Sequence, residues 1–111
     1  MKIKDLVYAK INDFAFLCKS NKVKSLYAFG SSVTDNFNEA SSDIDLLIEI
    51  DSDDPIEKGE KLLFLWDKFE DFFQRKVDLL TQNSLKNPVL KKSIDATKIL
   101  IYDGKRQEVS F

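Results

Sequence analysis

The sequence contains no histidine and only one cysteine, Cys18. Without histidine, the chain cannot build a Ser-His-Asp triad, a histidine general base or a zinc site with histidine ligands. A single cysteine cannot form an internal disulfide, and we expect Cys18 to be a small core residue. Any chemistry must therefore come from carboxylates, hydroxyls, lysine, arginine, backbone amides or a bound metal ion.

Excess charge of one sign and long hydrophobic runs are also missing. Lysine and arginine number 17 against 19 aspartates and glutamates, which gives a net charge of −2 and predicts no strong attraction to nucleic acid or anionic membranes. No stretch has the length and apolarity of a membrane-spanning helix or the layout of a signal peptide. We therefore expect a cytoplasmic protein that contacts neither a membrane nor nucleic acid directly.

The length and composition are typical of one globular domain. The chain has 111 residues, of which 43% are hydrophobic, and it shows no repeat and no Pro/Gly/Ser-rich linker. We expect a single domain over residues 1–111, with an N-terminal helix in 1–20, a core in 23–102 and a loosely held tail in 103–111.

Hydrophobic periodicity predicts that helices and strands alternate along the core. Helices are expected at about 3–19, 55–73 and 84–94, the last of them interrupted by Pro88. Strands are expected at 23–29, 43–50, 76–81 and 98–102. This order predicts an α/β (α+β) fold, in which a small mixed sheet has helices packed mainly on one face.

The helix expected at 55–73 carries an unusually wide apolar stripe. Its large apolar residues are Leu62, Leu63, Phe64, Leu65, Trp66, Phe69, Phe72 and Phe73. Such a stripe most often packs into the core. Eight large apolar groups are many for one helix of so small a domain, which leaves a partner-binding surface open as the alternative.

Two aspartates interrupt the apolar strand in the stretch SSDIDLLIEI, at Asp43 and Asp45. Side chains alternate along a strand, so both carboxylates point to the same side of the sheet while Ile44 and Leu46 point into the core. Two like charges this close repel each other unless a divalent cation lies between them or water reaches both. Mg²⁺ fits the first case, and a solvated strand edge without function is the alternative.

Two other short stretches offer groups that would complete such a site. In FGSS, a strand ends at Gly30 and Ser31 can begin a helix whose free amides favour phosphate, although a simple serine cap explains the same residues. In KVDLLT, Asp78 would join Asp43 and Asp45 if the two strands lie next to each other in the right register. Three convergent carboxylates are what two-metal phosphoryl or nucleotidyl transfer requires.

These residues together resemble a known family. The run GSSVTDNFNEASSDIDLLIEI followed by KVDLLT is similar to the minimal nucleotidyltransferase (MNT) family of the DNA polymerase beta superfamily. The resemblance covers residues 23–102 and implies a polymerase-beta-like nucleotidyltransferase core. It implies that Gly30 and Ser31 bind the nucleotide phosphates, and that Asp43, Asp45 and Asp78 are catalytic and bind Mg²⁺, with ATP as the substrate.

The chain departs from the family pattern in the loop after Gly30 and Ser31. The loop between Ser31 and Asp43 has eleven residues (43 − 31 − 1), one more than usual. The family often has arginine and glycine directly after Gly-Ser, whereas Ser32 and Val33 follow here. An arginine there would pair with phosphate, so its absence predicts weaker nucleotide binding or a cation supplied from elsewhere.

The resemblance also implies a partner. Members of the family commonly act as antitoxins paired with a HEPN-type toxin, which implies AMPylation of a toxin tyrosine with ATP as the donor. An antitoxin that neutralises its partner by contact alone is the second interpretation. A third is nucleotide transfer to a small molecule such as an aminoglycoside, attracted by the acidic residues Glu49, Asp51, Asp53 and Asp54.

Overall fold

The computed structural model describes residues 2–33 and 43–110, with residues 2, 31 and 32 described by their backbone alone. Its elements in chain order are α1 (Lys2–Ala9), α2 (Ile11–Ser20), β1 (Val23–Phe29), the 3₁₀ turn η1 (Gly30–Val33), β2 (Ile44–Ile50), α3 (Pro55–Phe73), β3 (Val77–Leu80), the 3₁₀ turn η2 (Gln82–Ser84), α4 (Pro88–Thr97), β4 (Ile99–Asp103) and β5 (Glu108–Val109). The eleven-residue loop predicted to follow Ser31 lies mostly outside the described residues.

The strands form one five-stranded sheet in the order β3-β2-β1-β4-β5. Strand β2 pairs with β3 in parallel, while β1 pairs with β2 and β4, and β4 with β5, antiparallel. The sheet is therefore mixed, as predicted. The sheet ends at β3, so this short strand exposes one backbone edge among the described residues.

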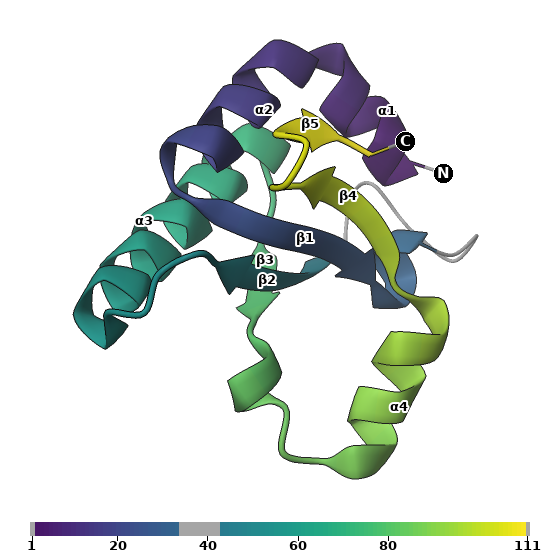
Figure 1. Cartoon of the computed structure of the whole chain (residues 1–111). Helices are drawn as coiled ribbons and strands as arrows, with labels where there is room; N and C mark the ends of the chain where they lie inside the picture. Colours follow the sequence, from purple (N-terminus) through teal and green to yellow (C-terminus); the bar gives the residue numbers. More distant parts are fainter. Residues whose placement is uncertain (1, 34–42, 111) are drawn as a thin grey trace.

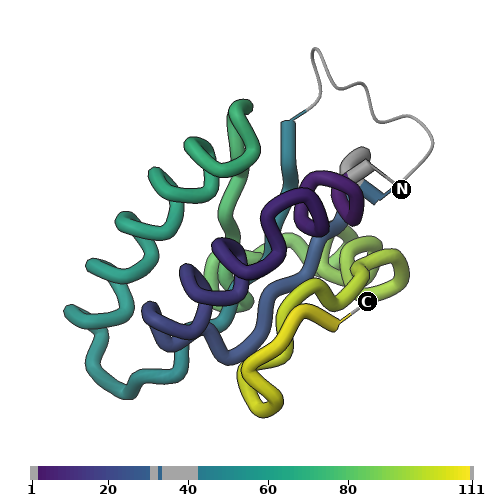
Figure 2. Tube along the Cα trace, turned by 90° about the horizontal axis from the view of Figure 1, so that it is seen from above, coloured from purple at the N-terminus to yellow at the C-terminus, as the bar shows by residue number. Residues whose placement is uncertain are grey.

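Three helices cover one face of the sheet, and α4 lies toward the other (Figure 1). Viewed from above, α2 and α3 run next to each other across the sheet (Figure 2). Phe14 of α2 stacks on Phe69 of α3 with ring centroids 5.8 Å apart. Cys18 is fully buried in the same layer, as predicted. The expectation of helices mainly on one face is confirmed.

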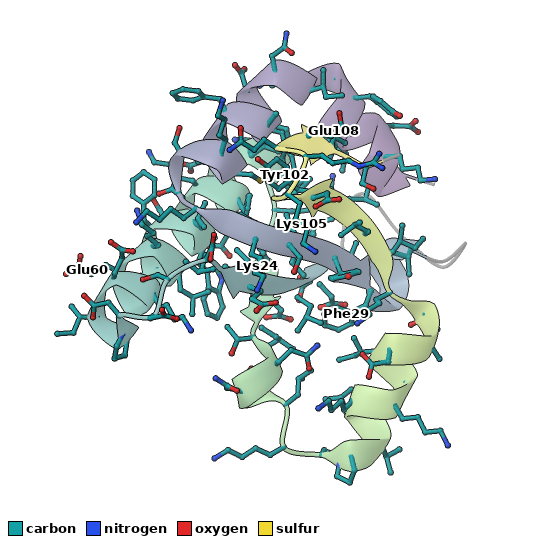
Figure 3. The ribbon with its side chains drawn as sticks, viewed as in Figure 1. Lys24, Phe29, Glu60, Tyr102, Lys105 and Glu108 are labelled. Carbon is teal, nitrogen blue, oxygen red and sulfur yellow. The ribbon has the colours of Figure 1, made fainter. Side chains whose placement is uncertain are left out.

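The second face of the sheet has a smaller apolar cluster. Phe29 and Leu47 pack with Ile94 of α4, and partly buried Tyr27 and Leu85 lie against them. Figure 3 shows Phe29 on the side of the sheet toward α4, and Tyr102 on the side toward α1 and α2. Strand positions 25, 27 and 29 on β1, and 45, 47 and 49 on β2, therefore face α4.

Helix α3 begins and ends where the sequence predicts. The Asp54 side chain accepts a hydrogen bond from the Ile56 amide at 2.9 Å, and Pro55 occupies the first helical position. Gln74 ends the helix in a left-handed conformation. Asp54 is thus a helix cap. Glu49 forms an ion pair with Lys24 at 3.6 Å. Two of the four acidic residues considered above as attracting a cationic small molecule therefore have partners within the protein.

Three local expectations were wrong. The N-terminal helix is two helices that break at Lys10, whose φ of −139° is not helical. Pro88 starts α4 instead of interrupting a helix, because the Asn87 side chain caps the amides of Val89 and Leu90. The tail is not loose throughout, since β5 pairs with β4.

None of the helices in the described part of the chain is long and apolar enough to cross a membrane.

Candidate active site

Asp45 and Asp78 lie directly opposite each other on the neighbouring parallel strands β2 and β3. Both side chains are half-buried and point to the sheet face toward α4. Their carboxyl groups are within hydrogen-bonding reach of each other. The register that the sequence left open therefore brings the second and third predicted carboxylates into contact.

Asp43 completes the group of carboxylates from just before β2. It is half-buried, and its charge acts on Asp45 together with that of Asp78. Burial, and then the charges of Asp78 and Asp43, raise the pKa of Asp45 from 3.8 to about 6. The site thus brings three carboxylates close together on one face of the sheet.

Gly30 lies against this group. Strand β1 ends at Phe29, which pairs with Asp45, and η1 begins at Gly30 with a φ of +66°. A Cβ atom at position 30 would lie 2.5 Å from Asp45 Oδ2. The backbone of η1 therefore approaches the carboxylate as only glycine allows. Ser31 follows in η1, and its side chain lies outside the described residues.

Two side chains of α3 hold the start of β3, a feature that the sequence analysis missed. The Trp66 indole Nε1 donates to the Val77 carbonyl at 2.7 Å, and the Val77 amide donates to Glu70 Oε2 at 3.0 Å. Both backbone groups of the residue before Asp78 are thus fixed by the helix. No sequence signal marked this role, because Trp66 fits the apolar stripe and Glu70 the polar face.

Replacing Trp66 with phenylalanine should loosen this edge strand. The change keeps most of the ring but removes the donor to Val77, so we expect a loss of about 1–2 kcal/mol in the free energy of unfolding. Urea denaturation followed by far-ultraviolet circular dichroism measures it. Glu70→Gln is the matched control, since its amide oxygen can still accept from Val77, and an equal loss in both variants would contradict the role of the indole.

The pKa of Asp45 predicts a pH dependence of stability in metal-free buffer. The pKa of Asp45 is about 6 in the folded protein, whereas the ordinary value of an aspartate is 3.8. Between pH 3.8 and about 6, the folded state therefore keeps a proton on Asp45 that the unfolded state loses. The free energy of unfolding should fall as pH rises through this window, and the destabilisation should be complete above about 6. Solvent screening at this half-exposed group limits the effect to about 1 kcal/mol.

Urea unfolding of wild type and Asp45→Asn between these pH values, with EDTA present, separates this contribution from that of the other carboxylates. We expect the advantage of Asp45→Asn to grow as pH rises. A difference between the two proteins that is the same at every pH would contradict the raised pKa.

The carboxylates form an open site and not a closed metal cage. Among residues 2–33 and 43–110, no group of three or more Asp, Glu or Cys side chains is arranged to hold a metal ion by itself. Mg²⁺, however, is usually bound by one or two carboxylates together with water and substrate phosphates. The touching pair Asp45 and Asp78, with Asp43 beside it, fits an ion that arrives with a phosphate ligand.

Comparison with known protein families decides the class. The model of the nucleotidyltransferase domain family matches residues 14–101, which include all five predicted site residues. The chain belongs to this family. The fold and the nucleotidyltransferase class expected from the sequence are thereby confirmed.

Curated relatives in the family come from an archaeon. The chain is 45% identical over 80 residues to MJ0126 of Methanocaldococcus jannaschii, which is named as a candidate protein adenylyltransferase. The match covers 72% of this chain and 78% of the relative. MJ1217 of the same organism, with the same description, is also 45% identical over 80 residues.

Solved structures of toxin-antitoxin proteins share the fold at low sequence identity. A toxin-antitoxin structure with AMP-PNP has a TM-score of 0.57 and 22% identity, and the match covers 88% of this chain and 80% of that one. A complex of a tri-AMPylated HEPN toxin from Shewanella oneidensis with its MNT antitoxin has a TM-score of 0.51 and 22% identity, and covers 86% and 71%. At this identity the likeness shows the fold alone.

Proposed function

We propose that this protein is a Mg²⁺-dependent adenylyltransferase that transfers AMP from ATP to a tyrosine hydroxyl of a HEPN-type toxin and so acts as an antitoxin. The observation that carries the proposal is the contact between Asp45 and Asp78 beside Gly30. The names of the archaeal relatives and the toxin complexes of the structural neighbours support it.

Each site residue has a role that follows from its position. Asp43 and Asp45 would hold Mg²⁺, with Asp78 as a further ligand, and the bound ion would polarise the α-phosphate and orient the triphosphate. The backbone at Gly30 and Ser31 lies where it can bind the triphosphate oxygens, because the glycine allows close approach. Half-buried Asp78 lies on the edge strand, where an acceptor protein can reach it.

The reaction then follows from this placement. The acceptor hydroxyl oxygen forms a bond to the α-phosphorus of ATP, the bond between the α-phosphorus and its bridging oxygen to the β-phosphate breaks, and pyrophosphate leaves. Asp78 accepts the proton of the hydroxyl as a general base. Burial, and then the charges of Asp78 and Asp43, raise the pKa of Asp45. The same concentration of negative charge would attract a divalent cation.

The direct test uses purified protein with Mg²⁺ and a purified HEPN-type toxin. ATP labelled at the α-phosphate should label the toxin, whereas ATP labelled at the γ-phosphate should not, because pyrophosphate leaves. Mass spectrometry should place one or more AMP groups on tyrosine. Absence of label on the toxin, with complex formation intact, would overturn the catalytic proposal.

Neutralisation by contact alone is the second candidate, and a groove between α2 and α3 favours it. The groove has a volume of about 580 Å³, and its lining includes Phe16, which is 72% exposed, and Phe64, which is 48% exposed. Exposed phenylalanines are typical of protein interfaces. Under this candidate, a variant without the Asp43 and Asp45 carboxylates would still protect cells that express the toxin.

A further inference from the structure

A small pocket lies on the same sheet face as the acidic site. It has a volume of about 170 Å³, and its floor is formed by strands β1 and β2, while Gln82 of η2 and Lys98 before β4 form its walls. The floor residues used below are Ser25, Tyr27, Leu47 and Glu49. We call it the sheet-face pocket.

The sheet-face pocket continues the acidic site along two strands. On β2, Leu47 and Glu49 follow Asp45 at alternate positions, so all three share one face. Leu47 pairs with Tyr27 of β1. Two strand residues span about 7 Å, so Leu47 follows Asp45 along β2 at a distance that a ribose with its 5′-carbon can span.

The strand order separates the two substrates. Gly30, which approaches Asp45, follows β1, so a triphosphate bound there lies on the β1 side of the carboxylates. Asp78 lies on the other side, on the edge strand β3. Under the proposed function, the acceptor would approach at β3, which leaves the sheet face over β1 and β2, where the pocket lies, for the remainder of the nucleotide.

The lining of the pocket suits a flat heterocycle. Leu47 is buried at the floor, and Tyr27 is held in place by Lys98, whose Nζ lies 4.5 Å from the ring centroid and 3.1 Å from Asp95 Oδ1. The lining also includes polar groups of Ser25, Glu49 and Gln82. A purine has apolar faces and carries hydrogen-bond donors and acceptors at its edge. The volume of the pocket is smaller than that of typical sites for whole drug-sized ligands, so it suits a single base.

We infer that the sheet-face pocket binds the purine base of the transferred nucleotide. This inference rests on the proposed function, because it takes the phosphates to bind at Gly30 and the carboxylates. Base contacts by Gln82 would then select ATP over other nucleotides, and aromatic and apolar contact with Tyr27 and Leu47 would supply affinity.

The test fills the pocket without changing the carboxylates. Ser25→Leu should weaken binding of α-labelled ATP with Mg²⁺ about tenfold in equilibrium dialysis, because the base is displaced. Inorganic tripolyphosphate, which has no base, should compete equally well in wild type and variant. Ser93→Leu is the matched control, since Ser93 is exposed on α4 and does not line the pocket.

Gln82→Ala is a second variant on the exposed wall of the pocket, where folding is least affected. It should reduce the preference for ATP over GTP several-fold in the same binding assay. Unchanged ATP binding in Ser25→Leu and an unchanged preference in Gln82→Ala would overturn the inference. The inference would also be overturned if the variants had a higher KM for the acceptor protein and an unchanged KM for ATP, because the pocket would then bind the acceptor.

These readouts distinguish the inference from the proposed function. Wild-type protein that binds ATP but transfers no AMP would refute the proposed function, and the binding of ATP by the two variants would still decide the base site. Wild-type protein that transfers AMP, with variants of unchanged ATP affinity, would refute the base site alone.

Discussion

Replacing Asp43 and Asp45 together with asparagine should reduce AMP transfer at least about 1,000-fold, because under the proposed function the metal ion would lose two charged ligands. The fold should persist, since both side chains are half-buried on the sheet face outside the main core and the change removes mutual repulsion. Transfer is measured with α-labelled ATP, and folding by thermal denaturation followed by circular dichroism.

The double change Asp51→Asn and Asp53→Asn is the matched control. It also removes two negative charges, but from exposed positions just after the other end of β2. We expect it to keep wild-type transfer. Equal loss in the two double variants would show a general charge effect, and full transfer by the Asp43/Asp45 variant would contradict the assignment of the site.

Replacing Gly30 with alanine should damage both the stability of the protein and AMP transfer. The new Cβ would lie 2.5 Å from Asp45 Oδ2, and the φ of +66° disfavours any L side chain. We expect a loss of about 1–3 kcal/mol in the free energy of unfolding. AMP transfer should fall by about 100-fold or more, since the carboxylate of Asp45 must move and small misplacements of reacting groups are costly.

Gly59→Ala provides a control for the Gly30 variant within the same protein. Gly59 lies inside α3, and a Cβ there meets no atom within 4 Å. Alanine should therefore stabilise the protein by about 0.5–1 kcal/mol and leave AMP transfer unchanged. A Gly30→Ala variant that behaves like Gly59→Ala would contradict the close approach of η1 to Asp45.

The parts of the fold that the sequence predicted well have local causes. Helix α3 was predicted with its observed bounds because Pro55, the wide apolar stripe and the polar turn before it are all visible in the sequence. The break at Lys10 was not predictable from periodicity, since Ile3, Val7, Phe14 and Cys18 are spaced as on the buried face of one straight helix. Strand β5 has two residues, too few for alternation to show.

The candidate site was predictable in its residue types but not in its assembly. The spacing of Asp43 and Asp45 fixes their common face within one strand. The contact between Asp45 and Asp78 depends on parallel pairing between β2 and β3, which are separated by the whole of α3. The hydrogen bonds of Trp66 and Glu70 to Val77 depend on how α3 packs, so they have no local sequence signal.

The hydrogen bond between Trp66 and Val77 gives this protein an intrinsic fluorescence probe next to the candidate site. Trp66 is the single tryptophan of the sequence, and its indole nitrogen is bonded one residue before Asp78. Intrinsic fluorescence therefore comes from one known place, where helix α3 holds the strand that carries the third carboxylate. A shift in emission on adding nucleotide would follow the state of that strand in unlabelled wild-type protein, in real time.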